Sequence, residues 1–84
     1  MNLNVIKIYI SKLKKDNLIS FLNNQNIILN EEEIDYLYNV LKYDYEKILE
    51  EDAYLFNNIK SNINPNSYNK LIELFKRYKD LYLK

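Results

Sequence analysis

The sequence predicts an all-α protein, a compact bundle of four to five short helices that forms a single domain over residues 1–84. Three observations lead to this prediction. Apolar side chains recur at steps of three and four residues along most of the chain, which is the period of an α-helix. Asn or Asp precedes several of these stripes, as expected for residues that cap helix N-termini. The chain is long enough for one domain, and its composition, 48% hydrophobic with nine Tyr and three Phe, supplies a core and argues against disorder.

The segment at residues 3–12 has two interpretations. Leu3, Ile6 and Ile10 have the spacing of a helix face, but the same run is rich in β-branched residues and alternates as a strand would. A strand needs a partner for its backbone N–H and C=O groups, and residues 26–30 are the one candidate. An isolated two-stranded ribbon is marginal in water, so a helix is favoured.

The next helix is expected over residues 15–24, and a longer one begins after Asn30. The Asn30 side chain can accept a hydrogen bond from the N–H of Glu33, whose carboxylate can reach back and close a capping box. Three glutamates in this first turn also suit the positive end of the helix dipole. We expect the helix to continue into the high forties, with a bend near residues 43–44. Its apolar stripe consists of Ile34, Leu37, Tyr38, Leu41, Tyr45 and Ile48.

Two further helices complete the expected bundle. Asp52 is placed to cap a short helix over residues 53–61. Asn64 and Pro65 mark the start of the last helix, because Asn suits the cap and Pro lacks only an N–H that the first turn does not use. The apolar residues are Tyr54, Leu55, Phe56 and Ile59 in the short helix and Tyr68, Leu71, Ile72, Phe75, Tyr78 and Tyr82 in the last one.

The sequence offers no candidate residue for catalysis, cofactor binding or metal binding. It contains no His and no Cys, which supply the usual general base, reactive thiol and zinc ligands. It contains no Gly, which phosphate-binding loops and nucleophile elbows require. The acidic runs at residues 31–33 and 50–52 are interpreted as solvated helix-end charges, because adjacent carboxylates on a helix point in different directions. We therefore expect neither an enzyme nor a protein with a small-molecule substrate.

The formal charge is zero overall, but it is distributed in blocks. Residues 1–15 carry a net charge of +4, residues 16–59 carry −8 and residues 60–84 carry +4. The basic ends could bind nucleic acid, with nearby tyrosines stacking on bases, or they could dock against the acidic middle of the same chain. The tyrosines concerned are Tyr9, Tyr78 and Tyr82.

The last helix favours the second of these interpretations. Glu73–Arg77 and Asp80–Lys84 have the acid-first spacing of four residues that supports ion pairs within a helix. A helix face of alternating sign is typical of a solvated surface whose charges pair with one another. Phosphate binding needs positive charge that is not already paired, so the nucleic-acid interpretation is disfavoured.

A second apolar stripe lies on the helix that follows Asn30. Tyr36, Val40 and Tyr43 fall roughly opposite the main stripe on a helical wheel. A helix that is apolar on two faces is either buried between its neighbours or presents one face to a partner. The first alternative places these three residues in the core. The second makes them a partner-binding patch, since tyrosine is enriched at protein interfaces.

Several short segments resemble known helical proteins. They are residues 10–13 (ISKL), 18–21 (LISF), 26–30 (NIILN), 33–38 (EIDYLY), 45–49 (YEKIL) and 64–68 (NPNSY). In these segments the chain resembles a family of small uncharacterised all-helical proteins of low-GC Gram-positive bacteria, a domain of unknown function. The resemblance implies a compact helical fold and no activity or site residues.

A second likeness covers residues 14–41, where a short helix, an extended segment and another helix resemble DNA-binding modules of the SAP type. Those modules present basic residues and usually a Gly in the connection. Here asparagines occupy residues 23, 24 and 26 of the connection, and the following helix opens with three glutamates. These departures argue against phosphate binding by this segment.

Together these observations predict a small non-enzymatic helical module that binds a protein partner or a second copy of itself. The alternative is a nucleic-acid-associated protein that uses its basic N- and C-terminal segments. No run of apolar residues reaches the roughly 18–20 that a membrane span requires. With no cysteine and no leader-like N-terminus, a cytoplasmic location is expected.

Overall fold

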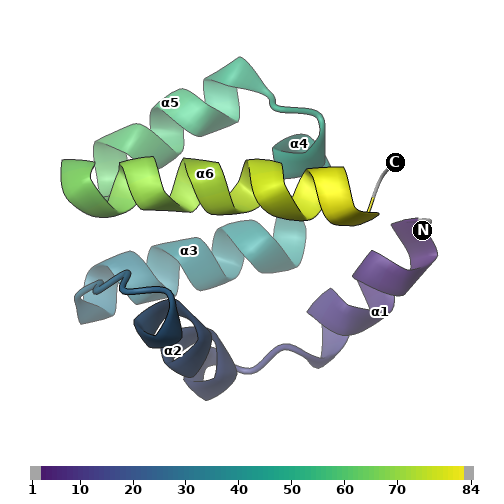
Figure 1. Ribbon diagram of the computed structural model, residues 1–84, viewed down its shortest axis with the longest axis horizontal. Coiled ribbons are helices and arrows are strands. Elements are labelled where there is room, and N and C mark those ends of the chain that lie inside the picture. Colours follow the sequence, from purple (N-terminus) through teal and green to yellow (C-terminus); the bar gives the residue numbers. More distant parts are fainter. Residues whose placement is uncertain (1–2, 83–84) are drawn as a thin grey trace.

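The computed structural model describes the backbone of residues 3–82 and the side chains of residues 7–80. Within that range the chain forms six helices and no strand (Figure 1). The helices are α1 (Leu3–Lys12), α2 (Lys15–Asn24), α3 (Glu31–Tyr43), α4 (Tyr45–Leu49), α5 (Ala53–Asn62) and α6 (Pro65–Tyr82).

The all-α prediction is confirmed, and the segment at residues 3–12 is the helix α1 rather than a strand. One helix more than expected is present because the bend near residues 43–44 is a break. Asp44 leaves helical geometry, with φ −125° and ψ 20°, although its N–H still donates to the Val40 carbonyl over 2.8 Å. The expected inward positions Leu3 and Ile6 lie outside the described side chains.

The helix caps form as the sequence predicts. The Asn30 side chain accepts from the Glu33 N–H at 2.8 Å, and the Glu33 carboxylate accepts from the Asn30 N–H at 2.9 Å, which closes the capping box of α3. Asp52 accepts from the third residue of α5 at 2.8 Å, and Asn64 does the same for α6 at 2.9 Å. Pro65 occupies the first position of α6. Each cap satisfies N–H groups that the helix itself leaves without partners.

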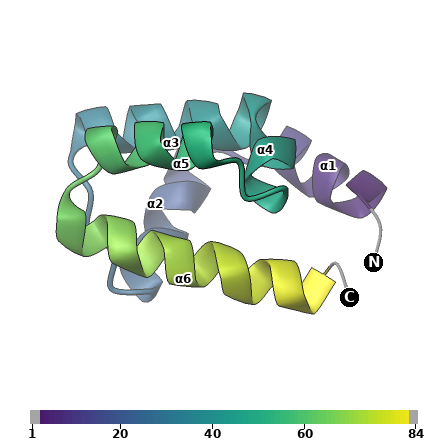
Figure 2. The same cartoon turned by 90° about the horizontal axis from the view of Figure 1, so that it is seen from above.

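Helix α3 is central to the bundle, since it contacts α1, α2, α4 and α5. In Figure 2, α3 and α5 lie in one layer and α6 in the other. The core between them is built on residues that are almost fully excluded from solvent, such as Leu37 at 0%, Ile59 at 0% and Leu71 at 1% exposure. Its other buried apolar members are Leu18, Leu22, Ile27, Ile34, Val40, Ile48, Leu55, Ile63 and Leu74.

Two connections use left-handed backbone at residues other than glycine. Asn26 has φ 61° and Glu51 has φ 54°. In both places the next N–H returns to the last turn of the preceding helix: Ile27 donates to the Leu22 carbonyl at 2.9 Å, and the residue after Glu51 makes the equivalent bond at 3.0 Å. This pattern is the Schellman motif at a helix C-terminus. Asn is the best substitute for Gly at its left-handed position.

The charge blocks meet across helix boundaries. Lys15 pairs with Asp35, and Lys79 lies 2.8 Å from the Glu51 carboxylate, so both basic ends contact the acidic middle. The expected pairing along α6 differs from this result. In the described part of the chain Glu73 and its neighbour four residues on form no ion pair, because exposed pairs gain little from holding two long side chains together. The second expected pair of α6 includes Lys84, which lies outside the described residues.

Candidate protein-interaction surface

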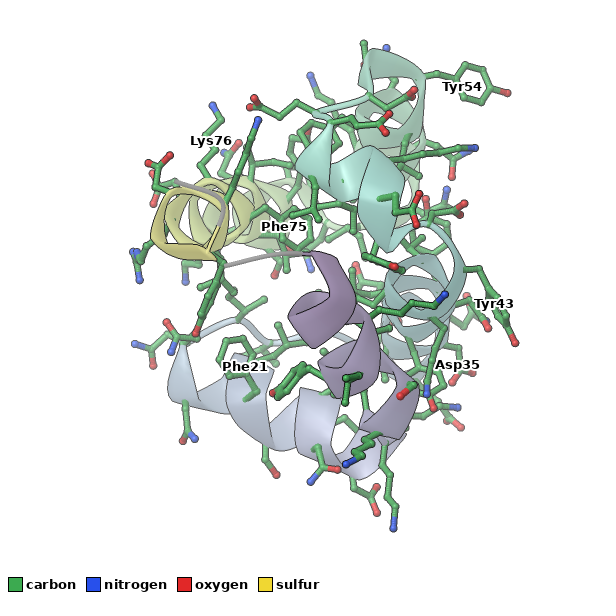
Figure 3. The ribbon with its side chains drawn as sticks, turned by 90° about the vertical axis from the view of Figure 1, so that its right-hand side faces the viewer. Phe21, Asp35, Tyr43, Tyr54, Phe75 and Lys76 are labelled. Carbon is green, nitrogen blue, oxygen red and sulfur yellow. The ribbon has the colours of Figure 1, made fainter. Side chains whose placement is uncertain are left out.

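The three residues of the second stripe of α3 have different environments. Val40 is buried, with 5% exposure, and belongs to the core. Tyr36 is half-buried and packs against that core. Tyr43 is 80% exposed (Figure 3). The stripe is therefore core at Val40 and open to solvent at Tyr43, and it does not form one continuous exposed patch.

Tyr36 joins α3 to α5. Its hydroxyl donates a hydrogen bond to the Asn58 side-chain oxygen. Asn62 donates to the same oxygen at 3.4 Å and to the Asn58 carbonyl at 2.8 Å, so Asn58 is held from two sides. Burial raises the pKa of the Tyr36 hydroxyl above its ordinary value of 10.0. The hydroxyl therefore stays protonated and able to donate at any physiological pH.

Tyr54 was expected among the apolar contacts of its helix, and the structure corrects this. It is 84% exposed, whereas Leu55 and Ile59 are buried and Phe56 is half-buried. The reason lies in helix geometry, because Leu55 and Ile59 are four residues apart and define the inward direction, and Tyr54 projects about 120° away from it. A helical wheel of this short segment contains the signal, but simple spacing of three and four does not distinguish Tyr54 from its neighbours.

Tyr43 and Tyr54 project toward the same side of the molecule, at separate heights (Figure 3). Helices α3 and α5 contact each other and run in opposite directions, and α4 lies between the C-terminal end of α3 and the N-terminal end of α5 (Figure 1). Figure 3 shows both rings pointing away from the body of the protein, on the side remote from α6 and Phe75. The Tyr36–Asn58 contact lies further along the same pair of helices.

Seven uncharged polar or aromatic side chains lie on α3 and α5 around the Tyr36–Asn58 contact. We refer to this set as the α3–α5 face, defined by Tyr36, Asn39, Tyr43, Tyr54, Asn57, Asn58 and Ser61. All of these except Tyr36 are exposed. Charge returns at the ends of the α3 row, with Glu32 one turn before Tyr36 and Asp44 directly after Tyr43. The Tyr36–Asn58 hydrogen bond joins the α3 and α5 members of this set.

The composition of this face suits contact with another protein. Interfaces are enriched in Tyr and depleted in Lys, Glu and Asp relative to the rest of a protein surface. Tyr, Ser and Asn are also the residues that antibody binding loops use, since tyrosine supplies rigid amphipathic area and the small polar side chains supply adaptable hydrogen bonds. The face can therefore bury aromatic area without leaving a charge unpaired.

Three residues of the acidic runs at 31–33 and 50–52 have roles in the fold. Glu33 closes the α3 cap, Asp52 caps α5 and Glu51 pairs with Lys79, which holds the pKa of the Glu51 carboxyl below its ordinary value. Across the described residues, carboxylates do not gather in any group of three that could hold a metal ion. None of the helices in residues 3–82 combines the length and apolar character of a membrane span.

The residues proposed for nucleic-acid binding are already engaged in part. Lys79 pairs with Glu51. The Tyr78 ring packs against Phe21, with ring centroids 5.9 Å apart, and Tyr9 is 67% exposed on α1. The side chain of Tyr82 lies outside the described residues.

Comparisons with known protein families, with curated proteins and with solved structures find no match. The resemblances noted from the sequence stay predictions. The geometry of the surface is what bears on function.

Proposed function

We propose that this protein is a small non-enzymatic interaction module that binds another protein chain through the α3–α5 face. The observation that carries the proposal is the pair of tyrosines, Tyr43 at 80% and Tyr54 at 84% exposure, on two helices that also expose several uncharged Asn and Ser side chains. Both belong to helices whose apolar sides are already used in the core. Their rings are therefore aromatic surface that the core does not use, carried on helices that pack into the bundle.

The hydrogen bond between Tyr36 and Asn58 supports the same proposal. It ties α3 to α5 at the centre of the face, so the two helices hold their relative positions before a partner arrives. Binding to a preformed surface loses less conformational entropy than binding that must first order it. A partner that fits would present its own uncharged, partly apolar surface, because an ion facing this area would be buried without a counter-ion.

A protein fits this face better than a nucleic acid does. Affinity for nucleic acid depends on Lys and Arg that neutralise phosphates, and none of the seven residues of the face is basic. The alternative, with the basic terminal segments as the binding site, is tested by the salt dependence of binding to generic duplex and single-stranded DNA. A steep loss of affinity between low and physiological salt would support that alternative.

The test of the proposed surface is a double variant, Tyr43→Ser with Tyr54→Ser. Both side chains are exposed, so folding should stay nearly intact, with a change in stability of roughly 0.5 kcal/mol per site or less. Interface anchors usually contribute about 2 kcal/mol or more each, so partner affinity should fall by roughly 30-fold per tyrosine. The control is Ile28→Ser, which removes an exposed apolar side chain away from the face.

The measurement combines affinity capture from the native cell, rebinding of the purified partner by calorimetry and a light-scattering mass for self-association. We expect a partner that wild type and Ile28→Ser retain and the double variant loses. The proposal is wrong if the double variant is folded and binds every recovered partner as wild type does. Loss of folding in the double variant would show that the tyrosines are structural.

A further inference from the structure

A cavity of about 430 Å³ opens in the bundle, and none of its described lining residues belongs to the α3–α5 face. Residues from α1, α2, α4 and α6 surround it, and α3 contributes to its floor. The deepest lining residues, Leu22, Leu37 and Leu71, are at most 2% exposed, so the cavity reaches the core. Phe21 from α2 and Phe75 from α6 line its walls, and both lie on the inner side of their helices in Figure 3.

Water is a poor occupant of this space. Protein interiors are close-packed and contain few voids larger than one water molecule. At about 30 Å³ per molecule, 430 Å³ corresponds to roughly fourteen waters. Each ordered water needs two to four polar partners, whereas the polar side chains of the lining are Asn17 and the tyrosines Tyr9, Tyr45 and Tyr78. Most of the volume therefore faces hydrocarbon and is better filled by an apolar molecule.

The charge of the lining defines the chemistry of that molecule. None of the described residues that line the cavity is acidic or basic. A carboxylate or ammonium group drawn into the cavity would be desolvated without a counter-ion, which is strongly unfavourable. An uncharged polar end can hydrogen-bond to an amide or a phenol hydroxyl, and Tyr9 and Asn17 are both exposed to solvent, as residues at the mouth must be.

The size of the cavity excludes a partner helix as the occupant. One turn of α-helix, about 10 Å wide and 5.4 Å high, already fills roughly 430 Å³. A stable protein interface buries about 800 Å² on each side, far more than a single turn provides. By contrast, the volume lies within the range of about 300–1,000 Å³ that is typical of small-molecule sites.

We propose that this cavity binds a neutral single-chain lipid, with the hydrocarbon chain against Leu22, Leu37 and Leu71 and an uncharged hydroxyl or ester end near Asn17 and Tyr9. The sequence gives no sign of this site, because its lining comes from five helices that are distant along the chain. The site is separate from the α3–α5 face and does not depend on the proposed function.

The experiment compares 1-dodecanol with dodecanoate at pH 8 on the full chain. The two ligands share a chain of the same length and differ in the charge of the polar end. Calorimetry should give one dodecanol per chain. Dodecanoate should bind at least about tenfold more weakly, because its carboxylate is partly desolvated at the mouth and no described lining side chain is basic. Dodecanol should also raise the Tm, since it binds only the folded state.

Two further measurements locate the site. Asn17→Trp fills the mouth from an exposed position, so it should fold and should lose dodecanol binding by about tenfold or more. Ile28→Trp adds the same side chain at an exposed position outside the cavity and should bind as wild type does. In wild type, nuclear Overhauser effects should connect the dodecanol chain to the methyl groups of Leu37 and Leu71, which does not depend on any variant folding.

The proposal is overturned if wild type binds no dodecanol up to its solubility limit, or if the bound chain shows no contact with Leu37 and Leu71. Equal binding of dodecanoate would overturn the assignment of a neutral ligand. Equal binding by a folded Asn17→Trp would overturn the assignment of the mouth.

Discussion

Ile59→Ala tests how the core is packed. Ile59 is 0% exposed on α5 and does not line the cavity, so its side chain is surrounded by protein. Removing three buried carbons loses about 2.4 kcal/mol at roughly 0.8 kcal/mol each. The space left behind adds to this, and such truncations cost about 2–5 kcal/mol in total. We expect about 3–5 kcal/mol, a large part of the roughly 4–13 kcal/mol available to 84 residues.

The matched variant is Leu41→Ala on α3. Leu41 belongs to the main stripe and packs against the core, but it is only half-buried and also lines the cavity. Its truncation widens an existing space, so we expect about 1–2 kcal/mol, below the usual range for a fully buried leucine. Urea unfolding monitored by circular dichroism measures both variants, and equal m-values validate the comparison. The reasoning is refuted if Ile59→Ala costs less than about 1 kcal/mol, or if Leu41→Ala costs as much as Ile59→Ala.

Three further predictions concern single contacts. Asn26→Ala should destabilise by about 1 kcal/mol and Asn26→Gly should not, because the left-handed backbone at this position disfavours a β-carbon. Thermal unfolding of both variants measures this difference, and equal Tm values for the two would contradict the explanation. Tyr36→Phe should cost about 0.5–1.5 kcal/mol by removing the hydrogen bond to α5, and a cost of zero in urea unfolding would mean that this bond adds nothing. The N–H of Asn30, followed by those of Asn64, lowers the pKa of Glu33 below its ordinary value of 4.5. The stabilisation that comes from this lowered pKa is present above pH 4.5 and is lost as the pH falls through the lowered pKa. Glu33→Gln should therefore lose less stability on acidification than wild type does. Identical curves of unfolding free energy against pH for the two proteins would contradict this.

The elements of the fold were predictable because their signals are local. A cap depends on residues three positions apart, as at Asn30 and Asp52, and both form in the structure. The bend near residue 44 was also a local signal, but whether it is a curve or a break depends on how α4 packs against α5 and α6. The number of helices was therefore underestimated even though the class was right.

The candidate surface was predictable only in part. The wheel places Tyr36, Val40 and Tyr43 on one side of α3, but it does not say which of them α5 covers. Burial of Val40 and exposure of Tyr43 follow from the position of α5, and the sequence contains no local signal for that position. Asn58 contacts Tyr36 across 22 residues of chain, and the cavity requires five helices at once. The periodicity of apolar residues predicts which face of a helix is apolar, but it does not predict contacts between residues that are distant in the sequence.

Glu33 shows how a local signal acquires a role in the tertiary structure. The sequence predicts it as the third residue of a capping box, which concerns α3 alone. In the structure the same carboxylate also accepts the backbone N–H of Asn64 at 2.7 Å and its side-chain amide at 3.2 Å. Since Asn64 caps α6, one carboxylate joins the starts of two helices that are more than 30 residues apart. The residue that closes the α3 cap therefore also holds the start of α6 beside the start of α3. Replacing it should loosen both helix starts together rather than α3 alone.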